Sequence, residues 1–362
     1  MKKNRLIILA LFLLLASALS ACSGRSLAAT SWPGVSVDTD RSVAYVAYNQ
    51  HIYAVDLANG TEKWRYPAEA DNKITFFAAP TLTADGQLLA GSYDDILYSL
   101  NPDSGQVNWS FGDADNRYIG SALANSQFIY APNADQNLYA LDLAGKEAWK
   151  FRTKQSLWAK PAKNGEMLYL PSMDHNLYAL DAQSGKLIWE SGDLEGALVG
   201  TPALGGNGEV YVGSFGYEML AIDSKDGSIL WRAPTDGWVW AGPLLEDGTL
   251  YFGDLNGHFY ALDATDGSAV WDISPAEGPV YAISDRPLII NDKLFYTSEN
   301  GDLYAVDKSN GNALWTRTIG GKLYGSPKQA GDSILIAPVD TEELLVAMDE
   351  NGNQQWKFTP AK

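Results

Sequence analysis

Short stretches in which apolar residues alternate with small or polar ones recur along the whole chain. In one representative unit they fall near 239–243 and at 249–253, 258–262 and 268–271, and Asp254-Leu255-Asn256-Gly257 separates the second from the third. Such alternation, bounded by Asn, Asp and Gly, is typical of β-strands joined by tight turns. No helical period longer than a turn or two occurs anywhere. The pattern therefore predicts an all-β chain made of units of four short strands.

The end of each unit carries a repeated motif, Ala-x-Asp-x-x-x-Gly-x-x-x-Trp. Five copies are complete; a sixth has Ser99 and Asn101 in the first two positions, and two others lack one turn residue. The tryptophans that close the eight copies are Trp64, Trp109, Trp149, Trp189, Trp231, Trp271, Trp315 and Trp356. Their spacings are 45, 40, 40, 42, 40, 44 and 41 residues, a period typical of propeller blades rather than of helical repeats.

The motif residues suit structural roles. The Asp carboxylate can accept hydrogen bonds from turn amides, Gly tolerates a positive φ, and a tryptophan at the same depth in every outer strand can fill the gap to the next unit. A four-stranded meander cannot bury both faces alone, so eight in a row are expected to close into a ring. We predict an eight-bladed β-propeller of antiparallel blades over residues 31–362. The sequence leaves open whether the segment before Trp32 adds a strand to the last blade.

The first 30 residues have a different composition. Lys2, Lys3 and Arg5 precede an apolar run over 6–18, which ends at Leu19-Ser20-Ala21-Cys22. This arrangement resembles a bacterial lipoprotein signal, which implies a signal peptide over 1–21, lipidation of Cys22 and a tether over 22–30. The alternative is an ordinary secretory signal with an incidental cysteine. The apolar run is shorter than the ~20 residues that a transmembrane helix needs.

The charge of the chain excludes two kinds of partner. The formal net charge is −18, and loss of Lys2, Lys3 and Arg5 with the signal would take it to −21. A surface this acidic repels phosphate, so nucleic-acid binding is not expected. Adsorption to anionic lipid is equally disfavoured, so we expect membrane contact through the N-terminal lipid alone.

Metal and thiol chemistry find little support in the sequence. Cys22 is the only cysteine, which rules out a disulfide or a Cys-ligated zinc site within the domain. His51, His175 and His258 fall in three different units, so we predict no metal site.

The repeat resembles the quinoprotein-type tryptophan-docking motif, and the resemblance covers residues 31–358. Two branches share it: the pyrroloquinoline-quinone dehydrogenases, and the non-catalytic lipoprotein subunit of the β-barrel assembly machinery. The chain is similar to the second in length and in its lipoprotein signal. The first branch implies a quinone, a calcium ion and in many members a vicinal cysteine pair, which one cysteine cannot supply. Neither quinone nor calcium is therefore expected, although the sequence does not exclude them.

One position departs from simple repetition. In six units a large residue stands three positions before the proline of the predicted inner strand, or before Ala122 in its place, and further aromatic residues lie beside two of them. Tyr281 lies near the corresponding place in the seventh unit, which carries a small insertion. We expect these residues near one mouth of the central channel. The candidate binding residues are Phe77, Tyr118, Trp158, Trp238, Trp240, Tyr281 and Tyr324. Two interpretations remain open: they fill the taper where blades converge, or they form a contact surface for a protein partner.

Together these features favour a non-catalytic, lipid-anchored scaffold for protein binding in the cell envelope, with a role in outer-membrane protein assembly and present as a monomer within a larger complex. The alternatives are a quinone-dependent dehydrogenase or a surface propeller that binds a small ligand. Ser23 after Cys22 resembles the sorting pattern for an outer membrane. In an organism with one membrane, the protein would instead sit on its outer face.

Overall fold

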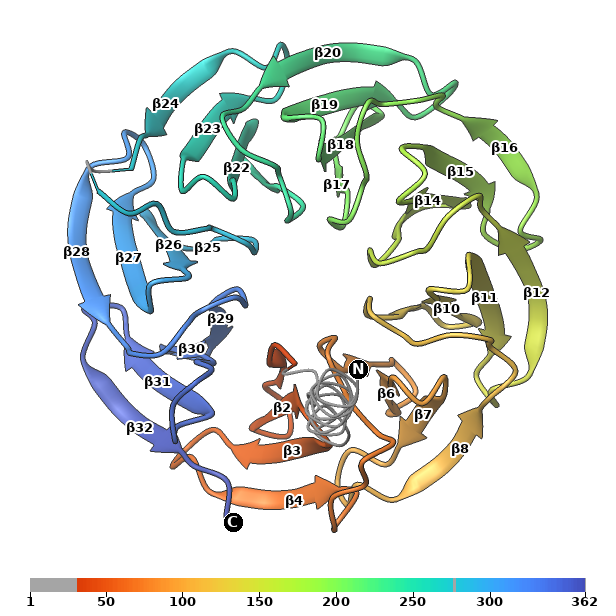
Figure 1. Ribbon diagram of the computed structural model, residues 1–362, viewed down its shortest axis with the longest axis vertical. Coiled ribbons are helices and arrows are strands. Elements are labelled where there is room, and N and C mark those ends of the chain that lie inside the picture. Colours follow the sequence, from red (N-terminus) through yellow and green to blue (C-terminus); the bar gives the residue numbers. More distant parts are fainter. Residues whose placement is uncertain (1–30, 276–277, 362) are drawn as a thin grey trace, which may run out of the picture. The chain divides into compact units, whose positions relative to one another are not determined.

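Eight four-stranded antiparallel sheets make up residues 31–275 and 278–361, the part of the chain that the computed structural model describes. Each sheet is one blade, and its four strands follow one another both along the chain and in space. The first strand of each blade lies nearest the centre of the ring and the fourth forms the outer rim (Figure 1). The all-β, eight-bladed propeller predicted from the repeat is thus confirmed.

The strands of blades 1 to 4 are β1 (Gly34–Asp38), β2 (Val43–Tyr48), β3 (His51–Asp56) and β4 (Glu62–Tyr66); β5 (Thr81–Leu82), β6 (Leu88–Gly91), β7 (Leu97–Leu100) and β8 (Val107–Phe111); β9 (Leu123–Ala124), β10 (Phe128–Pro132), β11 (Asn137–Asp142) and β12 (Glu147–Arg152); β13 (Ala162–Asn164), β14 (Met167–Pro171), β15 (Leu177–Asp181) and β16 (Leu187–Glu190). Those of blades 5 to 8 are β17 (Ala203–Leu204), β18 (Glu209–Ser214), β19 (Glu218–Asp223) and β20 (Ile229–Pro234); β21 (Leu244–Glu246), β22 (Thr249–Gly253), β23 (Phe259–Asp263) and β24 (Ala269–Ile273); β25 (Leu288–Ile290), β26 (Lys293–Ser298), β27 (Asp302–Asp307) and β28 (Ala313–Thr318); β29 (Lys328–Ala330), β30 (Ser333–Ile336), β31 (Leu345–Asp349) and β32 (Gln354–Phe358).

The inner strand of blade 6 lies further along the chain than the sequence predicted. The second strand falls where expected, at β22, but the predicted inner strand near 239–243 ends just before β21 begins at Leu244. Residues 240–242 instead line the central cavity and belong to no strand. The residues of this segment alternate because one side faces the cavity and the other faces the blades, and the segment forms no hydrogen-bonded strand pair among the described residues.

The motif residues of neighbouring blades meet at every interface. Within a blade, the motif Ala or Ser pairs in register with the Trp of the outer strand, for example Ala261 with Trp271, and a bulge follows it. The indole then lies over the motif Gly of the next blade, so that a Cβ on Gly227 would lie 2.6 Å from Trp189 Cε3. Glycine is needed here for a second reason, since φ at Gly227 is +77°.

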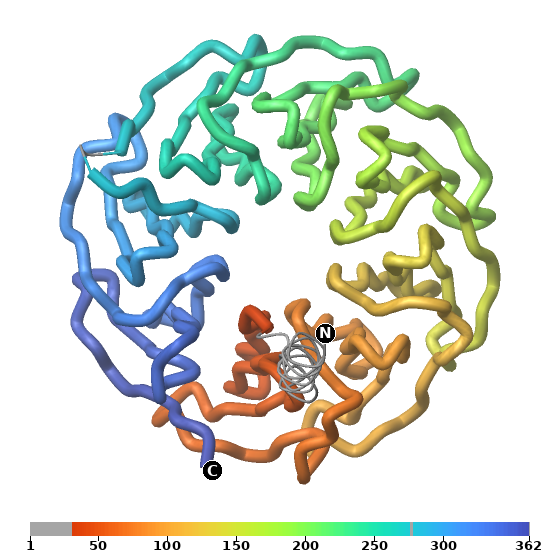
Figure 2. The backbone as a smooth tube through the Cα atoms, in the orientation of Figure 1, coloured from red at the N-terminus to blue at the C-terminus, as the bar shows by residue number. Residues whose placement is uncertain are grey.

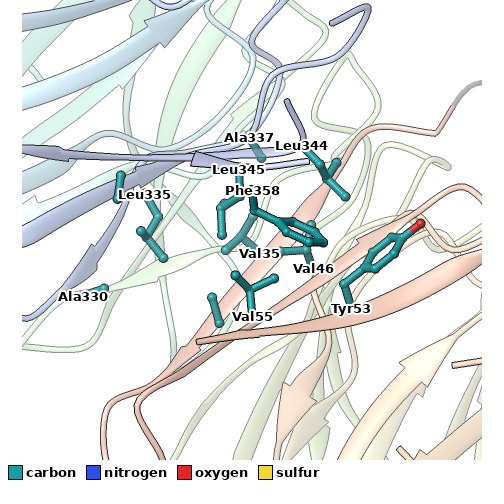
Figure 3. Close-up of a cluster of buried hydrophobic side chains, with 12 residues drawn as sticks. Val35, Val46, Tyr53, Val55, Ala330, Leu335, Ala337, Leu344, Leu345 and Phe358 are labelled. Carbon is teal, nitrogen blue, oxygen red and sulfur yellow. The ribbon is translucent and has the colours of Figure 1, made fainter. Parts of the chain in front are cut away.

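The ring closes without any exchange of strands. Among residues 31–275 and 278–361, blade 1 contains only β1 to β4 and blade 8 only β29 to β32. Residues 1–30, whose contribution the sequence left open, lie outside the described residues. Side chains of the two blades form one buried cluster, in which Phe358 packs edge-on against Tyr53 at a ring-centroid distance of 5.6 Å (Figure 3). The Trp356 indole donates to Leu57 O at 2.8 Å. The seam is therefore an ordinary interface between blades.

Membrane-spanning structure is not found in the described part of the chain, which holds no helix long and apolar enough to cross a bilayer. The predicted signal peptide, Cys22 and the tether lie outside the described residues.

Candidate functional site

Figure 2 shows the backbone of the eight blades arranged around a common centre. Residues of all eight blades line a cavity of about 430 Å³. Every blade contributes to it the same three-residue segment, which lies just before the inner strand or overlaps its first residue. The first positions of these segments, here called the mouth ring, are Trp32, Phe77, Ile119, Trp158, Val199, Trp240, Ser284 and Tyr324. The second and third positions are mostly Gly, Ala, Ser or Thr, because neighbouring segments approach closely: a Cβ on Gly200 would lie 2.4 Å from Gly242 N.

Aromatic side chains of the mouth ring contact one another from distant blades. Trp240 of blade 6 lies 5.6 Å from Trp32 of blade 1 and 6.3 Å from Trp158 of blade 4, measured between ring centroids. Trp32 in turn stacks on Tyr324 of blade 8 at 4.8 Å. Only the pair Trp32–Tyr324 joins adjacent blades. The two contacts of Trp240 cross the ring to non-adjacent blades, so these side chains narrow the mouth of the channel.

The aromatic contacts continue from the mouth onto the adjoining surface. Phe215, in the loop between β18 and β19, packs against Trp240 at 5.4 Å and stacks on Trp238 at 4.9 Å. Tyr217 of the same loop contacts Trp238 edge-on at 6.2 Å. Tyr217 and Trp238 are 50% and 43% exposed. We call Tyr217, Trp238, Phe215, Trp240 and Trp32 the aromatic run.

Polar contacts hold the Tyr324 side chain of the mouth ring in place. The Tyr324 hydroxyl donates to Glu299 Oε1 at 3.0 Å, and the Lys322 ammonium donates to the same oxygen at 2.8 Å. The hydrogen bond from Lys322 is the main reason that the pKa of Glu299 is lowered. Desolvation raises the pKa of Tyr324, so this ring stays neutral and hydrogen-bonded beside Trp32.

Four of the seven aromatic residues singled out in the sequence line the cavity: Phe77, Trp158, Trp240 and Tyr324. Trp238 does not line it but connects to it through Phe215. Tyr281, which was predicted to lie at the mouth, lies instead in a separate surface pocket with Tyr296 and Tyr304. Ser284 occupies the mouth-ring position of that blade.

The prediction that Tyr118 lies at the mouth is wrong. Its side chain is 1% exposed and packs over Gly91, between blades. The position before the mouth ring is apolar and buried in seven blades, as Phe76, Tyr118, Leu157, Leu198, Val239, Ile283 and Leu323. Comparing units at this position would have assigned Tyr118 to the core.

Sequence reasoning missed Trp32 because blade 1 has Val35 where most blades have the proline used for alignment. The register of β1 with β2 places Trp32 in the mouth ring, as the counterpart of Trp240. A different signal was available for Trp238. The equivalent residues in the other seven units are Thr30, Thr75, Arg117, Ser156, Ala197, Ala282 and Lys322, so an aromatic residue occurs there once in the sequence.

The eight motif tryptophans occupy the interfaces between blades. In seven of them the indole Nε1 donates to the carbonyl that follows the motif Asp or Asn of the next blade, at 2.8 to 3.2 Å. Trp149 Nε1 is buried and has no hydrogen-bond partner in the described residues. The motif Asp accepts hydrogen bonds from amides of its own turn, as Asp223 does from Lys225 N at 2.8 Å.

A metal site in the described residues would need several His, Cys, Asp or Glu side chains close together. No group of three or more His, Cys, Asp or Glu side chains there is arranged to hold an ion. His51, His175 and His258 lie in blades 1, 4 and 6.

Comparisons with known proteins agree with this architecture. An 80-residue stretch is 35% identical to outer membrane protein assembly factor BamB of Legionella pneumophila (strain Paris), covering 21% of this chain and 19% of that protein. The crystal structure of BamB from Moraxella catarrhalis superimposes with a TM-score of 0.68 at 15% identity, over 88% of this chain and 98% of that one. The computationally designed Ika8 protein gives 0.72 at 13%, over 90% and 96%. These structural matches show the fold alone.

A family model gives the assignment. It matches residues 15–156, 117–203, 173–291 and 282–361, and so extends over nearly the whole propeller. The chain therefore belongs to the family described as outer membrane protein assembly factor BamB.

Proposed function

We propose that this chain is a non-catalytic scaffold that binds a protein partner in the cell envelope and takes part in outer-membrane protein assembly. Membership of a family described as an assembly factor supports the process, and the aromatic run supports the mode of binding. The curated relative is matched over 19% of its length, so its role is carried over here only as part of the proposal.

The exposure of the aromatic run is the observation that carries this function. Tyr217 and Trp238 are about half exposed, and the fold does not require aromatic rings there, because the equivalent positions of other units are mostly small or polar. Exposed Trp and Tyr rings are typical of interface hot spots, because they bury a large area with few rotamers to fix.

Acidic side chains beside the aromatic run indicate the chemistry of the partner. Glu195 and Asp236 have side chains that are 74% and 67% exposed, and both belong to loops that contact the Phe215 loop or Trp238. A partner segment with apolar side chains at its centre and basic ones at its edges would complement this surface.

Lipid anchoring through Cys22 is part of the same proposal. The signal over 1–21 and the cysteine that follows it support an anchor on the outer membrane, or on the outer face of the membrane in a single-membrane cell. The intact mass of the mature protein tests this: cleavage before Cys22 with added acyl chains is expected, and an unmodified cysteine would contradict it.

The binding function is tested by recovering partners from intact envelopes with the tagged full-length protein, followed by mass spectrometry. Trp238→Ala combined with Tyr217→Ala should lower recovery of envelope assembly proteins at least tenfold, as hot-spot truncations do. Leu230→Ala is the matched control, since Leu230 is 49% exposed in the same blade as Tyr217 but on the outer strand β20. Equal recovery by the double variant and the control would contradict the proposed surface.

A further inference from the structure

The central cavity has the opposite charge balance to the chain that surrounds it. Three cationic residues, Lys160, Arg286 and Lys328, line it with one carboxylate, Asp285. The chain as a whole has a formal net charge of −18. The cavity at the centre of this strongly acidic protein therefore has an excess of cationic side chains.

Two of these cations are departures from the repeat. Lys160 and Arg286 occupy the third position of the cavity-lining segment in blades 4 and 7. The other six blades have small uncharged residues there: Gly34, Ala79, Ser121, Thr201, Gly242 and Ser326. Since six blades close around the cavity without a long side chain at this position, the fold does not require either cation.

Within the described residues, the Asp285 carboxylate forms no ion pair with these cations. Asp285 accepts hydrogen bonds from Ser326 N and from Arg286 N, both at 2.7 Å, so backbone amides hold its two oxygens. The Lys328 ammonium donates to Ser326 Oγ at 2.7 Å, and Arg286 Nε makes a long contact of 3.5 Å with Gly242 O. Within residues 31–275 and 278–361, the ion pairs found include none of the three cations.

The cations also affect one another. Burial lowers the pKa of Lys160, and the positive charges of Lys328 and Arg286 lower it further, so the three groups lie within electrostatic reach. Burial likewise lowers the pKa of Arg286, with Asp285 opposing the effect. Three desolvated cations with a single carboxylate beside them destabilise a fold unless a bound group compensates the excess charge.

We propose that the cavity binds a small, multiply charged oxyanion, held by Arg286, Lys160 and Lys328. A guanidinium presents a fork of donors that matches two oxygens of a phosphate or carboxylate, and the two ammonium groups add charge from other directions. A volume of about 430 Å³ suits a small molecule. Aromatic side chains of the mouth ring line the same cavity and contact one another across it, which favours a ligand of this size over a folded segment. This inference goes beyond the scaffold function and does not depend on it.

Calorimetric titration of the full-length chain in detergent, at constant ionic strength, tests the site with two probes: inorganic phosphate and citrate. Binding of either probe is expected; tighter binding of phosphate would identify a phosphate-like ligand, and tighter binding of citrate a polycarboxylate. Arg286→Gln and Lys160→Gln should each weaken binding at least tenfold. Lys63→Gln, which removes an equal charge from the surface of blade 1, should leave it unchanged.

Absence of heat with both probes, or equal binding by Arg286→Gln and Lys63→Gln, would overturn the proposal. A measurement on the unaltered protein guards against variants that fail to fold. Phosphate or citrate should raise the thermal unfolding midpoint more than potassium chloride at the same ionic strength. Identical midpoints in all three salts would also overturn it.

Discussion

The interfaces between blades and the lining of the channel arise from the same eightfold repeat, but residue identity is repeated at the interfaces and only backbone position is repeated in the lining. At the interfaces the residue itself is repeated, since a motif Trp lies over a motif Gly in blade after blade. In the mouth ring only the backbone position is repeated, and Trp, Phe, Ile, Val, Ser and Tyr all occupy it. Positions that keep one residue specify the ring, whereas positions that keep only geometry are available for binding.

Truncation of an interface indole should have the largest effect. Trp189→Ala and Trp271→Ala should each lower the free energy of unfolding by ~3 to 5 kcal/mol, since each removes a large aromatic ring and the hydrogen bond to Ser224 O or Lys308 O. Denaturant unfolding of the full chain measures this. Losses below about 1 kcal/mol in both variants would mean that the interfaces do not depend on these rings.

An intermediate effect is expected at the glycine beneath the indole. Gly227→Ala should cost about 1 to 3 kcal/mol, because the residue has φ of +77° and its Cβ would clash with Trp189. Gly248→Ala separates the two causes. Gly248 has φ of +78°, but a Cβ added to it would meet nothing within 4 Å, so it should show the backbone strain alone. An equal cost at both positions would remove the indole contact from the explanation.

The smallest effect is expected in the mouth ring. Trp158→Ala should change the free energy of unfolding by less than about 1 kcal/mol, because Trp158 makes one aromatic contact within the described residues, with Trp240, and Val199 occupies the same position of the next blade without a ring. The same denaturant series measures it. A loss as large as that of Trp189→Ala would place Trp158 among the residues that build the ring and would end the distinction between the two regions.

Repetition explains how far the sequence could be interpreted. The motif located the second, third and fourth strands of blade 6 to within about two residues, since an Asp-Gly turn and a Trp fix their ends. The inner strand was misplaced because it pairs with a strand on one side only, and the preceding residues 240–242, which line the cavity, have a similar apolar and small composition. The closure of the ring was not predictable, because contiguous and exchanged strands obey the same alternation.

The site was harder to predict than the fold for a physical reason. Aromatic character alone does not distinguish Tyr118, which is wedged between blades, from Trp158 of the next blade at the mouth. Neighbouring residues of an extended segment point to opposite sides, so a shift of one position exchanges core for cavity. Contacts such as Trp240 with Trp32 join residues far apart in the chain and depend on ring geometry that no local pattern encodes.

The contiguity of every blade has a consequence for the ancestry of the chain. Because every described blade consists of four strands that are consecutive in the chain, and blades 8 and 1 share the same contact from a motif indole to a backbone carbonyl as other neighbouring blades, no blade is topologically unique. Duplication, loss or cyclic reordering of whole units in the gene would leave each sheet intact and change only how many sheets share the circle. Each blade could also acquire its own cavity residue, as blades 4 and 7 have done, without a change in its neighbours.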